Sequence, residues 1–327
     1  MTEAAESKRN MPVRSVLLSG ASGCMGRQLA AELARRKVPV LRLVRREPKA
    51  PEELRWWPGA DRDGLVAAGG RGGGWVAEPE RLEGVGAAVH LSGASIAGRR
   101  WTAAWKREMW SSRVESTRRL SETLAGLRQR PQVLVCASAI GFYGDRGDAV
   151  LDEDAAGGTG FFPELCAAWE GATRAAVEAG IRVVHLRLGV VLSRADGALA
   201  RMLPVFRAGL GGRLGDGRQW MSWIGEEDAV RAFLWAMEQE TLRGAVNAVA
   251  PEPVTNREFT GKLARQVRRP AWLPAPGFAL RLALGEMADA ALLASTRVLP
   301  RRLEQSGFVF QQARLEDALQ AVVGRRS

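Results

Sequence analysis

The sequence predicts an α/β fold: a Rossmann-type doubly wound parallel sheet with a smaller, interleaved C-terminal lobe. Three observations lead to this prediction. Apolar runs that suit buried parallel strands alternate with amphipathic helical stretches along most of the 327 residues. A glycine-rich turn joins the first of these strands to the first helix. A proline-rich segment, 270–276, precedes two further helical stretches that we expect to form a small C-terminal piece.

The first crossover, residues 14–46, is the best-defined unit. Apolar runs at 16–18 and 38–44 predict strands, and apolar residues at four-residue steps over 25–33 predict the helix between them. The turn before this helix carries three glycines, spaced Gly20-x-x-Gly23-x-x-Gly26.

This glycine spacing is typical of a dinucleotide-binding turn. Gly20 allows a sharp turn, Gly23 lets the backbone approach a pyrophosphate, and Gly26 lets the helix pack closely on the sheet. The N–H groups at the helix N-terminus attract phosphate. We therefore expect the cofactor to contact Gly20, Ser22, Gly23, Cys24, Met25 and Gly26.

The end of the second strand indicates which dinucleotide binds. About 20 residues after the glycines, an NAD-binding protein usually has an acid for the ribose 2′-hydroxyl. Here Arg45 and Arg46 follow the strand. Guanidinium groups pair with a 2′-phosphate, so the sequence predicts NADP(H). The alternative is that both arginines are solvated charges in an arginine-rich chain.

The later elements continue the alternation of strands and helices. We expect strands over 87–91, 133–138, 181–192 and 245–249, and helices over 102–127, 162–179 and 226–237. Thr255 begins another helix, in which Glu258 completes a capping box. The carboxyl ends of parallel strands face the ligand, so Ser92, Gly93 and Ala94 are predicted cofactor contacts.

Composition excludes several classes of function. The net charge of +11 comes almost entirely from arginines spread along the chain, without a basic helix, so we do not expect nucleic-acid binding. No apolar run approaches the roughly 20 residues of a membrane span. Residues 1–12 resemble a disordered leader, and 69–74 a flexible glycine loop. Three cysteines without metal-type spacing suit the cytoplasm and predict no metal site.

Several motifs together resemble a known family. Gly20-x-x-Gly23-x-x-Gly26, the run at 138–144 and Glu170 resemble the extended short-chain dehydrogenase/reductases. The stretches 93–102, 211–220, 250–259 and 297–303 narrow the likeness to an atypical, epimerase-family (NAD-dependent epimerase/dehydratase-like) branch of oxidoreductases with an extra C-terminal domain. The resemblance implies a Rossmann domain over 13–192, to which 220–250 returns, and a substrate-binding lobe and C-terminal domain over 193–219 and 251–323.

The catalytic pair of this superfamily is missing from the sequence. The resemblance implies a Tyr-x-x-x-Lys pair, but the two places hold Phe162 and Cys166, and Tyr143 is the single tyrosine of the chain. Ser138, or Ala139 without a gap, occupies the superfamily's serine place. Arg113 stands where the superfamily often has an asparagine.

Ser138 and Tyr143 are the predicted catalytic residues. A phenol with a pKa of about 10 could replace the missing acid, although a packed structural ring is the alternative for Tyr143. A satisfied hydroxyl at a strand end is the alternative for Ser138.

On the substrate side we expect Arg99, Trp101, Trp220 and Trp223 to line a cleft for a small, planar or apolar carbonyl-like molecule, against the alternative of core tryptophans and solvated arginine. The sequence thus predicts an NADP(H)-dependent oxidoreductase. A non-catalytic NADP(H) sensor or interaction protein and a cofactor-retaining epimerase or isomerase stay as alternatives, and a homodimer is left open.

Overall fold

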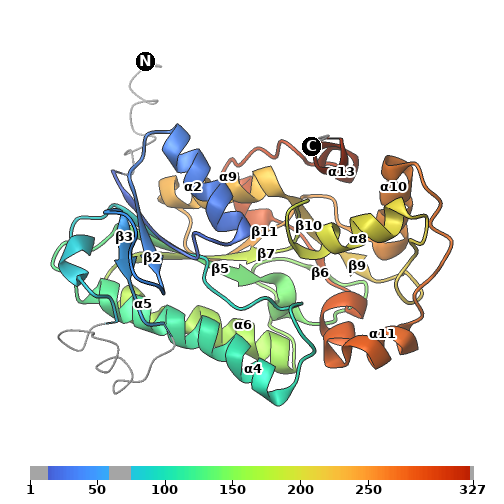
Figure 1. Ribbon diagram of the computed structural model, residues 1–327, viewed down its shortest axis with the longest axis horizontal. Helices are drawn as coiled ribbons and strands as arrows, with labels where there is room; N and C mark the ends of the chain where they lie inside the picture. Colours follow the sequence, from blue (N-terminus) through green and yellow to red (C-terminus); the bar gives the residue numbers. More distant parts are fainter. Residues whose placement is uncertain (1–13, 59–74, 325–327) are drawn as a thin grey trace.

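The computed structural model describes residues 14–58 and 75–324; the leader expected at 1–12 and the loop expected at 69–74 lie outside these ranges. Within them, seven strands form one sheet whose neighbouring strands are all parallel (Figure 1). In spatial order these are β11 (Gly244–Ala248), β7 (Arg182–Leu188), β5 (Val133–Ala139), β4 (Ala87–His90), β1 (Val16–Ser19), β2 (Val40–Val44) and β3 (Glu53–Arg55). This sheet confirms the Rossmann-type α/β fold that the sequence predicts.

The strand order places a switch point between β1 and β4. From β1 the chain proceeds outward to β2 and β3, then returns to the other side of β1 as β4 and continues to β5, β7 and β11. Dinucleotides bind across such a switch point, beyond the carboxyl ends of the strands. The candidate site therefore lies at this edge of the sheet.

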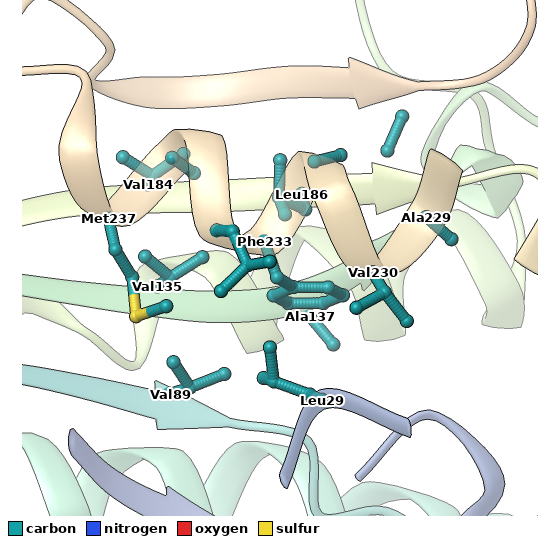
Figure 2. Close-up of a cluster of buried hydrophobic side chains, with 14 of the residues drawn as sticks. Leu29, Val89, Val135, Ala137, Val184, Leu186, Ala229, Val230, Phe233 and Met237 are labelled. Atoms are coloured by element: carbon teal, nitrogen blue, oxygen red, sulfur yellow. The ribbon is translucent and has the colours of Figure 1, made fainter. Parts of the chain in front are cut away.

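Helices cover both faces of the sheet (Figure 1). One face carries α2 (Cys24–Arg35) and α9 (Glu226–Glu238); the other carries α4 (Ala103–Trp110), α5 (Ser116–Ala125) and α6 (Phe161–Gly171). The short helix α7 (Arg174–Glu178) packs against α5. Figure 2 shows Phe233 of α9 among apolar side chains of the strands and Leu29 of α2, all of them buried. Burial of this apolar area fixes both helices on the sheet.

Three of the expected elements are interrupted. The helix expected at 102–127 contains a π-helical turn, Ser111–Glu115, between α4 and α5. The one expected at 162–179 is divided between α6 and α7. The strand expected at 181–192 breaks at Gly189, where a Cβ would lie 2.7 Å from the Ser222 carbonyl oxygen, and continues as β8 (Val190–Leu192) against β10 (Trp223–Gly225) in another sheet.

The remaining elements form the lobe beside the sheet and its connections. These are α8 (Gly197–Arg207), β9 (Trp220–Met221), β12 (Val254–Thr255), α10 (Asn256–Val267), α11 (Gly277–Leu284), a π-helical turn (Ala288–Leu293), β6 (Val150–Leu151), β13 (Arg297–Val298), α12 (Arg301–Gln305), α13 (Leu315–Val323) and two 3₁₀ turns (Pro79–Leu82 and Ile140–Tyr143). Thr255 and Glu258 cap α10 reciprocally, which confirms the predicted capping box. No helix within 14–58 and 75–324 is long and apolar enough to cross a bilayer.

A buried histidine ends β4, one of the two strands that flank the switch point. His90, the last residue of β4, is fully buried. Its Nδ1 lies 2.6 Å from Ser19 Oγ, and its Nε2 lies 3.3 Å from Ser116 Oγ. Burial lowers the pKa of His90 to about 3, so the imidazole is neutral at physiological pH.

We expect this histidine to make folding pH-dependent. In the unfolded chain the imidazole has its ordinary pKa of about 6.5. Between pH 6.5 and 3 it therefore binds a proton that His90 does not bind in the folded chain. The free energy of unfolding should therefore fall as the pH drops from 6.5 toward 3, by up to about 1.4 kcal/mol per pH unit. Urea unfolding of wild type and His90→Asn between pH 6.5 and 5 measures this slope, which should be shallower in the variant. Equal slopes would contradict the prediction.

Candidate dinucleotide site

The turn between β1 and α2 packs closely against the chain that follows β4 and against the start of α2. Gly20 has φ +74°, and a Cβ on it would lie 2.8 Å from the Leu91 carbonyl carbon at the end of β4. A Cβ on Gly26 would lie 2.2 Å from the Gly20 carbonyl oxygen, so a side chain there would push α2 away from the strand. The turn and the end of β4 therefore adjoin.

The N-terminus of α2 suits an anion. Gly23 is its N-cap residue, no side chain caps it, and its first turn carries no acid. The N–H groups of this turn are thus left for a ligand such as a pyrophosphate. Ser22 lies exposed on the turn, and Met25 packs against the main core.

Cys24, the first residue of α2, reaches α9. Its thiol donates to Glu226 Oε1 at 3.0 Å and lies 3.4 Å from Ser193 Oγ. Burial raises the pKa of Cys24, and the hydrogen bond to Glu226 raises it further. The thiol is consequently held protonated, and its backbone is the part that suits phosphate contact.

The two arginines after β2 differ in their surroundings. Arg46 donates to both carboxylate oxygens of Glu53, at 2.6 and 2.8 Å, and Glu53 also accepts from the Lys49 N–H at 2.7 Å. The Arg46 guanidinium lowers the pKa of Glu53 to about 2. Arg45 is exposed and has no ion pair within the described ranges. Arg45 therefore has the more available guanidinium for a 2′-phosphate, while Arg46 is anchored to β3.

Two hydrogen bonds to Ser112 and Arg113 hold the loop that follows β4. Ala94 N–H donates to Ser112 Oγ at 3.0 Å, and the Ala94 carbonyl accepts from Arg113 Nη2 at 2.8 Å. Ser92 and Gly93 precede it, beside the Gly20 turn. The structure thus brings the residues predicted from two separate strands, β1 and β4, to one place.

A buried polar network begins at the carboxyl end of β5. Ser138 Oγ donates to Glu170 Oε1 at 2.7 Å, and Glu170 forms a bidentate pair with Arg187, both bonds being 2.8 Å long. Burial acts to lower the pKa of Arg187, but the hydrogen bond and charge of Glu170 outweigh this and raise it. Ser138 therefore orients its proton toward a carboxylate.

Tyr143 requires a correction. The side chain is fully buried, its hydroxyl accepts from Arg187 Nη1 at 3.0 Å and donates to Asn247 Oδ1 at 2.7 Å, and burial raises its pKa. A phenol with both hydrogen-bonding functions occupied inside the protein does not reach a substrate. Tyr143 is a structural residue, which is the alternative that the sequence left open.

The two places expected for the Tyr-Lys pair lie on α6 and are apolar. Phe162 packs edge-on to Trp101 with ring centroids 5.6 Å apart. Cys166 is fully buried, which raises the pKa of its thiol to about 12. Neither side chain exchanges a proton near neutral pH.

The four predicted substrate-binding residues are spread over two regions. Arg99 is exposed beside Trp105, and Trp101 is largely buried against Phe162 and donates to the Ile96 carbonyl at 2.8 Å. Trp220 is half-buried in the lobe and donates to Asp148 Oδ1 at 2.9 Å. The structure corrects the expectation for Trp223, which lies in β10 with no exposed surface and so cannot line a cleft.

Sequence reasoning missed Arg187 and Asn247. The available signal was a charged residue inside an apolar strand, because such a residue is rarely buried without a partner. Glu170, the partner of Arg187, was noted only as part of the family likeness.

Two family models match this chain. A family model described as the NAD dependent epimerase/dehydratase family matches residues 16–248, and one described as a domain of unknown function, DUF1731, matches 275–322. The chain belongs to the NAD-dependent epimerase/dehydratase family. This confirms the resemblance that the sequence motifs carried.

Relatives in this family cover nearly the whole chain. An epimerase family protein of Mycobacterium tuberculosis is 45% identical over 304 residues, 93% of this chain and 96% of the relative. The chloroplastic SDR39U1 homologue of Arabidopsis thaliana is 36% identical over 315 residues, 94% of this chain and 86% of the relative. The crystal structure of human epimerase family protein SDR39U1 with NADPH has a TM-score of 0.84 at 31% identity, covering 95% of this chain and 100% of that chain.

The buried Glu170–Arg187 pair joins α6 to β7, and we expect its loss to be costly. Glu170→Gln would leave the Arg187 guanidinium buried without a carboxylate, so the free energy of unfolding should fall by about 3–5 kcal/mol. Denaturant titration measures this loss. Glu115→Gln, which breaks an exposed pair with Arg118, is the matched control and should cost at most about 1 kcal/mol. Equal losses in both variants would contradict the prediction.

Proposed function

We propose that this protein is an NADP(H)-dependent oxidoreductase of the extended short-chain dehydrogenase/reductase type. The observation that carries the proposal is the uncapped N-terminus of α2 behind a close-packed glycine turn, with Arg45 available at the neighbouring strand end. The human relative whose structure contains NADPH supports it. When bound, the cofactor would supply the hydride.

The roles of the chain's own residues follow from their positions. The first turn of α2 would hold the pyrophosphate, and Arg45 would hold the 2′-phosphate, with Arg46 steadying the loop through Glu53. Ser92, Gly93 and Ala94 would border the cofactor by their backbone. Ser138 would steady the end of β5, beside the substrate, through its hydrogen bond to Glu170.

The side chains beside β5 support a planar or apolar substrate. Ala139, the last residue of β5, packs with Trp101, Phe161 and Phe162 in one apolar cluster. Aromatic side chains of this kind suit a flat or apolar carbonyl compound better than a bare sugar. Arg99, exposed beside Trp105, and Trp220, half-buried in the lobe, would contribute from two separate regions.

The proton would come from solvent in this proposal. Tyr143 is buried, Ser138 donates to Glu170, and Phe162 and Cys166 do not titrate near neutral pH. A positioned acid typically contributes roughly 10²–10⁴-fold in rate, so its lack slows hydride transfer without preventing it. The same observation favours a second candidate, a protein that binds NADP(H) without turnover as a sensor.

The three cysteines are free thiols, which supports a cytoplasmic location.

Charge reversal at Arg45 tests the choice of cofactor. In Arg45→Asp the affinity for NADPH should fall by roughly 10- to 100-fold, because a charged hydrogen bond to the 2′-phosphate is lost, while NADH affinity should hold or rise. Calorimetric titration with both dinucleotides measures the ratio. Arg14→Asp makes the same change of charge before β1, at the opposite edge of the sheet, and should leave the ratio unchanged. Unchanged discrimination in Arg45→Asp would overturn the assignment.

Turnover separates the oxidoreductase from the sensor. Stopped-flow absorbance should show oxidation of bound NADPH when quinones, enones or ketones are added, and the planar or apolar acceptors should react fastest. Tight NADPH binding without oxidation by any acceptor would favour the sensor and overturn the oxidoreductase.

A further inference from the structure

A buried arginine lies behind the loop that follows β4. Arg113 is 6% exposed, and within residues 14–58 and 75–324 it forms no ion pair with a carboxylate. Its Nη2 donates to the Ala94 carbonyl at 2.8 Å, its Nη1 makes only a 3.5 Å contact with the Met109 carbonyl, and its Nε is buried without a hydrogen-bond partner. Burial lowers the pKa of Arg113 to about 10, so the guanidinium stays charged at neutral pH. A buried cation with so few partners is costly unless a ligand supplies acceptors.

The surroundings of this guanidinium are defined on three sides. A Cβ on Gly93 would lie 3.2 Å from Arg113 Cζ, so the backbone of the loop lies directly against the guanidinium. The ring of Trp169 lies 5.1 Å from Cζ on α6. Cys166, one helical turn before Trp169, is close enough for its charge and that of Arg113 to affect each other's pKa.

The local backbone also points to a ligand. Arg113 occupies the π-helical turn Ser111–Glu115, which interrupts α4 and α5. Such single π turns occur frequently at functional sites.

Strand order decides which part of a dinucleotide would lie here. The adenosine 2′-phosphate belongs at the end of β2, and the pyrophosphate at α2, which follows β1. The other half of the molecule must then extend toward β4 and β5, on the opposite side of β1. The Gly93–Ala94 loop over Arg113 lies on that side.

We infer that Arg113 binds the nicotinamide-side ribose of NADP(H), donating from its guanidinium to the ribose hydroxyl oxygens. The inference rests on the proposed function and adds a positioning residue to it. Arg113 would hold the ribose, and through it the nicotinamide ring, beside the apolar cluster at the end of β5.

Two ligands separate this role from a structural one. NADPH contains the nicotinamide-side ribose, whereas adenosine 2′,5′-bisphosphate contains the 2′-phosphate but lacks that ribose. In Arg113→Met the affinity for NADPH should fall by roughly 10- to 100-fold, because charge-assisted hydrogen bonds are lost. The affinity for adenosine 2′,5′-bisphosphate should stay within about two-fold. Calorimetry on the purified full chain gives both values without any turnover.

Two variants act as controls. Arg113→Lys keeps the charge and should recover part of the NADPH affinity. Arg118→Met, on the same helical stretch but exposed in pairs with Glu115 and Glu122, should change neither affinity. The thermal midpoint of ligand-free Arg113→Met shows whether the chain still folds; Arg113→Lys provides the comparison if it does not.

Equal losses for both ligands would mean that Arg113 only supports the loop, and would overturn the inference. Unchanged NADPH affinity in Arg113→Met would overturn it as well. Wild-type protein that binds neither ligand would overturn the proposed function itself, and this inference with it.

Discussion

The bidentate ion pair between Glu170 and Arg187 is the contact on which the site's architecture depends. It joins α6 to β7, and through Ser138 and Tyr143 it also fixes the end of β5 and the turn that follows. In a low-dielectric interior such a pair holds its geometry only if the remaining donors and acceptors are satisfied. Here Asn247 completes the set by accepting from Tyr143 and donating to the Leu299 carbonyl. These contacts tie together the carboxyl ends of β5, β7 and β11.

The sequence predicted the parts of the fold that depend on neighbours in the chain. The glycine turn, the helix after it, the capping box at Thr255 and the parallel strands are set by local spacing and by alternation of apolar runs. The apolar run at 87–91 predicts a strand, and β4 is buried along its whole length, His90 included. The break at Gly189 was missed because it depends on Ser222, 33 positions later (222 − 189), whose carbonyl approaches the strand.

The candidate site was only partly predictable for the same reason. Tyr143 is a polar side chain after a strand end, and sequence alone does not show that Arg187 and Asn247, 44 and 104 residues away, enclose its hydroxyl. Trp223 follows a loop in the sequence but pairs with β8 and enters the lobe's core. Arg113 was noticed as a departure from a family pattern, whereas its burial and its place behind Ala94 needed three dimensions. Gly20 and Gly26 act through their backbone, and the structure shows the tight turn and the close approach that their spacing predicts.

The interleaving of lobe and sheet limits how the chain can be assembled. Ser295 reaches back 148 residues to the Gly147 carbonyl, β13 pairs with β6, and Arg302 N–H donates to Glu153 from 149 residues away. Contacts of such long sequence separation form late, because the intervening loop must close first. On the ribosome, β6 and the turn before it must therefore wait for about the last tenth of the chain. A nascent chain that ended after β11 would lack α12, which packs against this strand, and the edge of the sheet would be left without that cover.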